Sequence, residues 1–84
     1  MAFATNPLGT LAPGAGITYY WHNSGYTDMG VLILQPHPLN PGGILLVVGT
    51  RKENVPGVGI RYAVSFKNIG NVSTNWSLEG GGVV

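Results

Sequence analysis

Hydrophobic and polar residues alternate with a period of two in the C-terminal third of the chain. The alternation runs through residues 58–66 and again through residues 72–78, on either side of a turn-forming segment at residues 68–70. This period places apolar side chains on one face of a half-buried antiparallel strand. The two runs predict a hairpin with a three-residue loop and with Gly70 in the left-handed conformation. A common apolar face sets the facing pairs as Phe66 with Val72, Val64 with Thr74, and Tyr62 with Trp76.

Three further segments carry strand signals. Residues 17–22 alternate, with Ile17, Tyr19 and Trp21 on one face, and end at a turn-forming Asn-Ser-Gly. Residues 31–34 and 44–48 are apolar at every position and flank the turn signal Asn-Pro-Gly-Gly. A strand that is apolar on both faces is covered on both faces. In so small a protein that cover must come from a sister sheet or from a neighbouring subunit. For a neighbouring subunit, the candidate interface residues are Leu32, Leu34, Leu46 and Val48.

The remaining segments predict little regular structure. Residues 1–16 predict an extended arm with at most one edge strand, residues 51–57 a charged loop, and residues 80–82 a flexible glycine joint. No window of eleven residues keeps a helical spacing of apolar positions without Gly or Pro. We therefore expect an all-β chain in which residues 17–84 form one small antiparallel β-sandwich of about five to seven short strands.

The composition indicates self-association. The 84 residues include four Lys or Arg and three Asp or Glu, for a net charge of +1, whereas an average chain of this length carries about 21 charged residues. Low charge lets copies approach one another without repulsion. Together with the apolar strands, it predicts a homo-oligomer. Four basic residues are too few to follow a nucleic-acid backbone, so no nucleic-acid partner is expected.

The sequence contains no cysteine, so neither a disulfide nor a thiolate metal site is expected. The N-terminal residues lack a basic segment followed by a long apolar one, and no signal peptide of the usual kind is predicted. The longest apolar run, at residues 44–48, is five residues long, whereas a helix that spans a bilayer needs about 20. We expect no transmembrane helix, and a location outside the cell or on a cell or particle surface is favoured.

The side chains that catalysis requires are sparse. Only His22 and His37 are available as general bases, no Gly-x-Ser-x-Gly segment accompanies them, and no pattern brings two of the three carboxylates together. A zinc site formed by His22, His37 and Asp28 has enough ligands, but their spacing matches no known motif. We expect no enzyme, no catalytic residue, no metal and no cofactor.

An aromatic cluster near the first strand is the most suggestive group for binding. Aromatic faces beside Asn and Asp often hold sugars, because the ring stacks on apolar C–H faces while amides and carboxylates bind the hydroxyls. The alternation leaves one set of residues on the outer face and the following turn as a candidate glycan-binding rim: Tyr20, His22, Asn23, Tyr26 and Asp28. Ordinary packing at a sheet edge explains the same residues, and both interpretations stay open.

Two segments are similar to known families. Residues 62–70 and 72–78, which read as a strand, an Asn-x-Gly turn and a closing strand, resemble the end of small immunoglobulin-like β-sandwich modules of bacterial surface proteins. That resemblance implies an immunoglobulin-like fold. Residues 38–43, with Lys-Glu-Asn-Val at 52–55, are similar to a segment of the cyanobacterial and myxobacterial mannose-binding agglutinins. This second similarity implies a mannose ligand, although the agglutinins repeat the segment and carry tryptophan where this chain has Leu39 and Leu45.

Two functions from different classes remain after these exclusions. The first is a non-enzymatic structural subunit that assembles with itself, as the low charge and the doubly apolar strands indicate. The alternative is a lectin-like module that binds carbohydrate through the aromatic rim. A multivalent lectin would combine the two, because an oligomer multiplies weak sugar sites.

Overall fold

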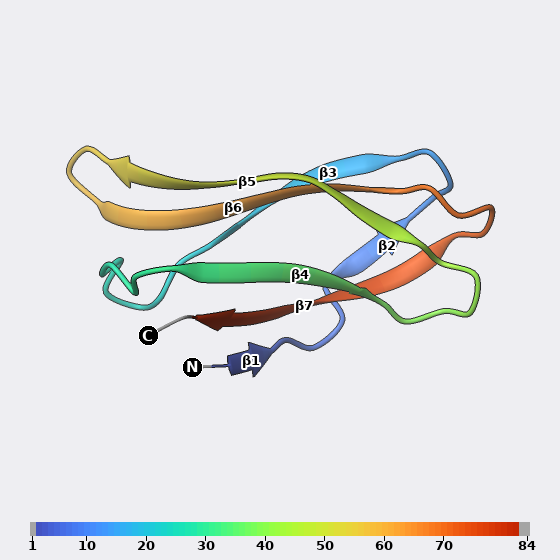
Figure 1. The fold of residues 1–84 in the computed structure, drawn as a ribbon, viewed down its shortest axis with the longest axis horizontal. Helices are drawn as coiled ribbons and strands as arrows, with labels where there is room; N and C mark the ends of the chain where they lie inside the picture. The colour runs from blue at the N-terminus through green and yellow to red at the C-terminus, as the bar shows by residue number, and fades with distance from the viewer. Residues whose placement is uncertain (1, 83–84) are drawn as a thin grey trace.

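The computed structural model describes residues 2–82 and shows two antiparallel β-sheets packed face to face, with no helix in that range. The all-β prediction is confirmed. In one sheet, hereafter sheet A, β7 lies in the middle, with β4 on one side and with β1 and β2 end to end on the other; in the second, sheet B, the order is β3-β6-β5 (Figure 1). The strands are β1 (Ala2–Ala4), β2 (Gly9–Leu11), β3 (Gly16–Trp21), β4 (Leu32–Pro38), β5 (Leu45–Val55), β6 (Gly59–Asn68) and β7 (Thr74–Gly82).

The core lies between the two sheets and follows the predicted alternation. The inward face of β6 supplies Tyr62, Val64 and Phe66, and the inward face of β7 supplies Trp76 and Leu78. The Trp76 ring meets the rings of Phe66 and Tyr19 edge to face, with centroids 5.0 and 5.5 Å apart. Such pairs add about 0.5–1.5 kcal/mol each beyond the area that they bury, so Trp76 joins both sheets.

The predicted hairpin between the last two strands is wrong. β6 and β7 belong to different sheets, and residues 69–73 cross from one sheet to the other, so the predicted facing pairs do not exist. The inner faces of two packed sheets both face the same core. Two strands in different sheets therefore show the same alternation of apolar and polar residues as the two strands of a hairpin. Gly70 has no positive φ. It is glycine because a Cβ would overlap the Gly42 carbonyl of the neighbouring loop.

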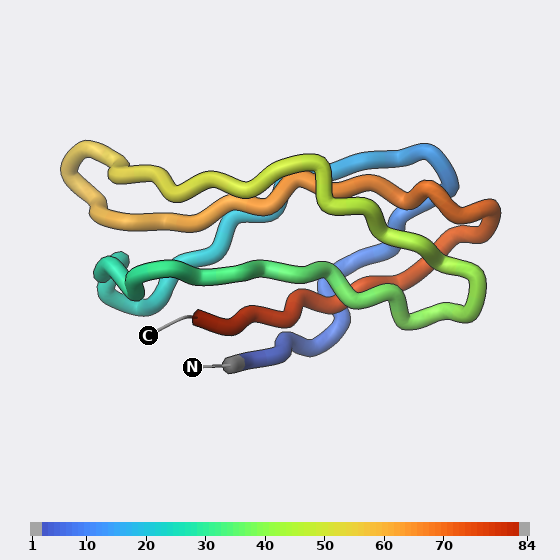
Figure 2. Tube along the Cα trace, in the orientation of Figure 1, coloured from blue at the N-terminus to red at the C-terminus, as the bar shows by residue number. Residues whose placement is uncertain are grey.

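The crossover is held by the fully buried side chain of Asn68. Its amide nitrogen donates to the carbonyls of Leu11 (3.0 Å) and Val72 (2.7 Å), and its oxygen accepts the Gly70 N–H (2.9 Å). The loops at residues 39–44 and 69–73 lie at the same end of the molecule (Figure 2), where Ile69 donates its N–H to the Ile44 carbonyl (2.8 Å). The Asn68 side chain therefore links β2, the end of β6 and the crossover at residues 69–73.

The segment predicted as a charged loop is the second half of a long strand. β5 continues to Val55, and its register on β6 shifts between Val47 and Gly49, where a bulge inserts one extra residue. Before the bulge, Leu45 and Val47 lie opposite the inward-facing Asn68 and Phe66. After it, a polar set faces the same way: Thr50, Lys52 and Asn54 lie opposite Val64, Tyr62 and Ile60. The change of face at the bulge breaks the alternation, which hides the strand in the sequence.

The glycine segment predicted as a flexible joint is also strand. β7 runs to Gly82 and pairs with both β1 and β4. Gly80 makes room for Phe3, because a Cβ at position 80 would overlap the Phe3 ring. That ring stacks on Trp21 with centroids 4.6 Å apart. The Phe3 ring of β1 therefore fills the space that a side chain at position 80 would occupy.

The N-terminal residues lie along the edge of sheet A and carry two short strands where at most one was predicted. β1 and β2 both pair with β7. The connection between them stays on the same edge, where Thr5 and Leu8 donate their N–H groups to the carbonyls of Leu78 (2.8 Å) and Trp76 (2.9 Å). The predicted arm is thus paired with β7 of its own chain.

Candidate functional site

A charged cluster occupies one half of the outer face of sheet B. It consists of Tyr20 from β3, Arg61 from β6, and Arg51 and Glu53 from β5. Glu53 accepts hydrogen bonds from the Nε atoms of Arg51 and Arg61. These bonds hold the pKa of Glu53 below its usual range, and the bond to Glu53 raises the pKa of Arg51. Tyr20 completes the cluster: the Arg61 guanidinium lies 4.3 Å from its ring centroid, and its hydroxyl accepts a bond from Arg51 Nη2 (2.8 Å).

A second ion pair closes the loop that follows β3. Lys52 Nζ donates a hydrogen bond to Asp28 Oδ1, which also accepts the Gly30 N–H (2.8 Å). The lysine is the largest cause of a lowered pKa at Asp28, and Asp28 in turn raises the pKa of Lys52. The Tyr62 hydroxyl donates to the Gly30 carbonyl (2.9 Å) and accepts the Met29 N–H (3.0 Å). The start of β4 is thereby anchored to sheet B.

The turn at residues 22–27 forms a third group. The rings of His22 and Tyr26 stack with centroids 3.7 Å apart. The Asn23 side chain accepts the Thr27 N–H (2.9 Å) and donates to the Thr27 hydroxyl. Tyr26 has a φ of 51°, in the left-handed region, and its carbonyl accepts the Ile60 N–H (2.8 Å). The turn is therefore fixed onto the start of β6.

The structure divides the five predicted rim residues among these three groups. Tyr20 belongs to the charged cluster, His22, Asn23 and Tyr26 to the turn, and Asp28 to the ion pair. One face of the Tyr20 ring is covered by Arg61, and one face of the Tyr26 ring by His22. Sequence reasoning missed Arg51, Lys52 and Arg61 as their partners. The one signal was the spacing of Arg51 and Glu53, because residues two apart share a face of a strand.

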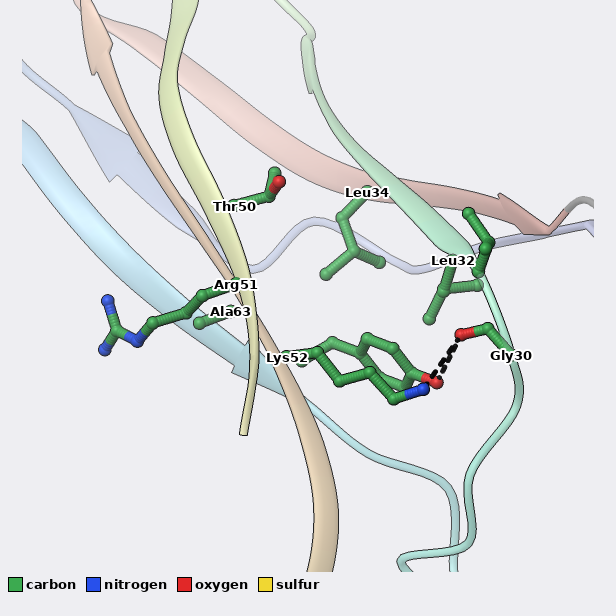
Figure 3. Close-up of a pocket in the computed structure, with 9 residues that line it drawn as sticks. Gly30, Leu32, Leu34, Thr50, Arg51, Lys52 and Ala63 are labelled. Carbon is green, nitrogen blue, oxygen red and sulfur yellow. Dashed lines mark hydrogen bonds between the residues drawn. The ribbon is translucent and has the colours of Figure 1, made fainter. Parts of the chain in front are cut away.

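A groove of about 460 Å³ opens between the sheets along the β4–β5 side (Figure 3). Leu32 and Leu34 of β4 form its apolar wall, and Tyr62 of β6 also lines it. On the β5 side the wall is Thr50 and the stem of Lys52, whose Nζ lies 5.6 Å from the centroid of the Tyr62 ring. The groove exists because β5 presents polar side chains to the interior after the bulge, and these do not close the gap between the sheets.

An apolar patch occupies the other half of the outer face of sheet B. It consists of Ile44, Leu46, Val48 and Ile69, all exposed, with Leu46 at 44% and Val48 at 64%. Ile44 lies next to Ile69, and Leu46 lies opposite Lys67 of β6. The patch contains two of the four predicted interface residues, Leu46 and Val48.

The other two predicted interface residues face the core. Leu34 is 3% exposed, so its assignment to an interface is wrong, and Leu32 is half-buried against the core cluster. β4 alternates after all: Leu32, Leu34 and Pro36 point inward, while Ile33 is exposed on the outer face of sheet A. A run of apolar residues in sequence thus conceals an ordinary two-faced strand.

Residues 2–82 contain no group of three or more His, Cys, Asp or Glu side chains that could hold a metal ion. The zinc site considered for His22, His37 and Asp28 is therefore not formed, and His37 instead lies 3.4 Å from Glu79 on sheet A. The described chain also offers no helix with the length and apolar character needed to cross a bilayer.

Comparison with known proteins returns no match: no family model, no curated protein and no solved structure is similar to this chain at a significant level.

Proposed function

We propose that this protein is a non-enzymatic structural subunit that assembles with copies of itself, with the apolar patch of sheet B as a contact surface. The observation that carries the proposal is the distribution of apolar side chains. Among residues 2–82, twelve large apolar side chains are exposed, whereas eight hydrophobic residues are buried. An oligomer would convert part of that exposed surface into buried surface.

The apolar patch is suited to such a contact. Its four side chains each have about half of their surface exposed, and covering that half would contribute about 1 kcal/mol per side chain. The charged residues lie elsewhere on sheet B, since Arg51, Glu53 and Arg61 are bonded to one another beyond the bulge. A second copy would therefore meet the patch without having to desolvate that cluster.

The absence of catalysis is part of the same proposal. The carboxylates of Asp28 and Glu53 are held by Lys52 and by two arginines, and His22 is stacked on Tyr26. Groups bonded in this way stabilise loops and strands. The carbohydrate alternative gains no observation in its favour, because the residues of the rim are bonded within three separate groups.

The test is the absolute mass in solution, measured by light scattering behind a sizing column across a tenfold dilution. We expect a multiple of 8.8 kDa. Leu46→Lys should lower that mass without changing the circular dichroism spectrum, because it puts a charge into the contact. Leu8→Lys is the matched control, since Leu8 is 39% exposed on the edge of sheet A. A mass of 8.8 kDa at every concentration would contradict the proposal.

A further inference from the structure

Both edges of sheet A carry features that prevent the addition of another strand. At the β4 edge, Leu39 donates its N–H to the Asn75 carbonyl (2.9 Å), so the odd-numbered residues of this segment bond to β7. Pro36 and Pro38 therefore face the free edge, where they offer no N–H. The opposite edge is divided into β1 and β2 by residues 5–8, which include Pro7.

The β5 edge of sheet B is protected in a different way. Arg51, Lys52 and Glu53 follow one another along the strand, and the bulge between Val47 and Gly49 interrupts its ladder. Charges and bulges on an edge strand are the usual means by which a protein discourages pairing with another chain. A strand added along the full length of β5 would have to lie beside these three charged side chains.

The β3 edge has none of these features. Its six residues, Gly16–Trp21, include no proline, charge or bulge, and most are β-branched or aromatic. Asn68 donates its N–H to the Ala15 carbonyl (2.9 Å), so the even-numbered residues of β6 direct their backbone groups to β3. Ile17, Tyr19 and Trp21 lie opposite those residues and bond to them. The N–H and C=O groups of Thr18 and Tyr20 consequently point to the free edge.

We propose that β3 pairs antiparallel with β3 of a second copy, about a two-fold axis at Tyr19, so that the two copies of sheet B become one continuous sheet. This inference rests on the proposed function, because it names a specific contact of the assembly. Such an interface is isologous: the same strand supplies both sides.

The register follows from the faces of the strand. Side chains directly opposite each other in a sheet share a face, so Tyr19 lies opposite Tyr19 of the second copy. Thr18 then lies opposite Tyr20, and each exchanges both backbone hydrogen bonds with the other. Ile17 lies opposite Trp21. Both pairs join a β-branched side chain to an aromatic one, which is a favourable cross-strand combination.

A second copy fits this edge better than an unrelated chain does, because the sequence of β3 is complementary to itself. No like charges meet in the register, and the pairing gives Ile17 a cover that the monomer lacks. Ile17 is on the inward face but is 40% exposed, since it lies at the border of the sheet with no strand beyond it. Trp21 of the second copy would lie directly against it.

The contact is small, since a six-residue strand is about 20 Å long, and interfaces of this scale form complexes at the weak end of the range. The decisive variant is Thr18→Pro, which removes an N–H from the centre of the free edge. Thr18→Val is the matched control: it loses the hydroxyl bond to Ser65 (2.7 Å) but keeps the N–H. We expect the dissociation constant, measured by sedimentation equilibrium, to rise at least tenfold for proline and to stay within threefold of wild type for valine.

A covalent test covers the case in which the proline variant does not fold. The chain has no cysteine, and side chains opposite each other in this type of pair have Cβ atoms about 4.5–5.5 Å apart. Tyr19→Cys should therefore form an intermolecular disulfide under mild oxidation by air. Ile33→Cys, exposed on the outer face of sheet A, is the control and should cross-link at least tenfold more slowly.

The outcomes separate the two proposals. A wild-type oligomer that keeps its affinity in folded Thr18→Pro, or a Tyr19→Cys variant that cross-links no faster than Ile33→Cys, overturns the β3 contact and leaves the proposed function standing. A wild type that stays at 8.8 kDa at all concentrations overturns both.

Discussion

The two halves of β5 differ in almost every property, although they belong to one strand and pair with one neighbour. Before the bulge, β5 puts Leu45 and Val47 toward the core and exposes Leu46 to solvent. After the bulge, it presents Lys52 to the groove and directs Arg51 to the outer face, where the charged cluster lies. The two halves differ in the residues that they turn inward: apolar side chains before the bulge, where the core is closed, and polar side chains after it, where the groove stays open.

The largest expected effect comes from a charge at the inward position of each half. Val47→Lys would place an ammonium group against Phe66, the residue opposite it, and should lower the free energy of unfolding by about 2–4 kcal/mol. Thr50→Lys also faces inward but lies in the groove, and should change it by less than about 0.5 kcal/mol. Urea denaturation measures both. Equal losses of stability in the two variants would contradict the distinction between the closed core before the bulge and the open groove after it.

A smaller effect is expected from acid, and it belongs to the charged half alone. The pKa values of Glu53 and Asp28 are lowered by their cationic partners, so the folded state releases these protons more readily than the unfolded state does. The stability that the two carboxylates contribute is complete above their unfolded pKa values of about 4 and is lost as the pH falls through the lowered values.

Thermal unfolding from pH 7 to pH 2 should therefore show a lower midpoint in acid. Glu53→Gln should flatten that decline, because the glutamine amide does not titrate. High salt should also reduce it, since exposed ion pairs are screened. An acid limb that is unchanged in Glu53→Gln would show that this cluster does not cause the pH dependence.

A small effect is also expected from deletion of Val48, the extra residue at the boundary between the two halves. Without it, Val47 and Gly49 would lie opposite Phe66 and Ser65 in an unbroken ladder, and Thr50 would keep its place opposite Val64. The free energy of unfolding should change by less than about 1 kcal/mol, while the apolar patch loses one of its side chains. Urea denaturation and solution mass check this prediction, and a collapse of the fold would show that the bulge is required for packing.

The sequence predicted the faces of the strands better than their partners. The alternation at Tyr62, Val64, Phe66, Trp76 and Leu78 identified most of the core, because burial repeats every two residues in a strand. It did not assign β6 and β7 to sheets, since both inner faces look into one core. The pairing of β7 with β1 and β4 joins residues far apart in the chain, and no local pattern encodes it.

The candidate site was predicted in part, for a related reason. Tyr20 and Asp28 were identified as exposed polar or aromatic residues, and both are engaged in ionic contacts. Their partners Arg51 and Lys52 were not, because residues 51–55 show no apolar alternation and read as a loop. Arg61 lies in a predicted strand, but its contacts with Glu53 and Tyr20 depend on strand pairs that the sequence pattern did not give. The open groove beside β4 lets β5 carry polar residues on its inward face, and only the three-dimensional arrangement reveals this.

The position of β7 makes one sheet depend on a single strand. Among residues 2–82, β7 comes last in the sequence, yet it is the centre of sheet A, and β1, β2 and β4 have no other partner in that sheet. The pairing of sheet B, in contrast, is complete within residues 16–68. Removal of residues 74–82 would therefore abolish every strand pair of sheet A, keep all the pairs of sheet B, and uncover the apolar inner face of sheet B.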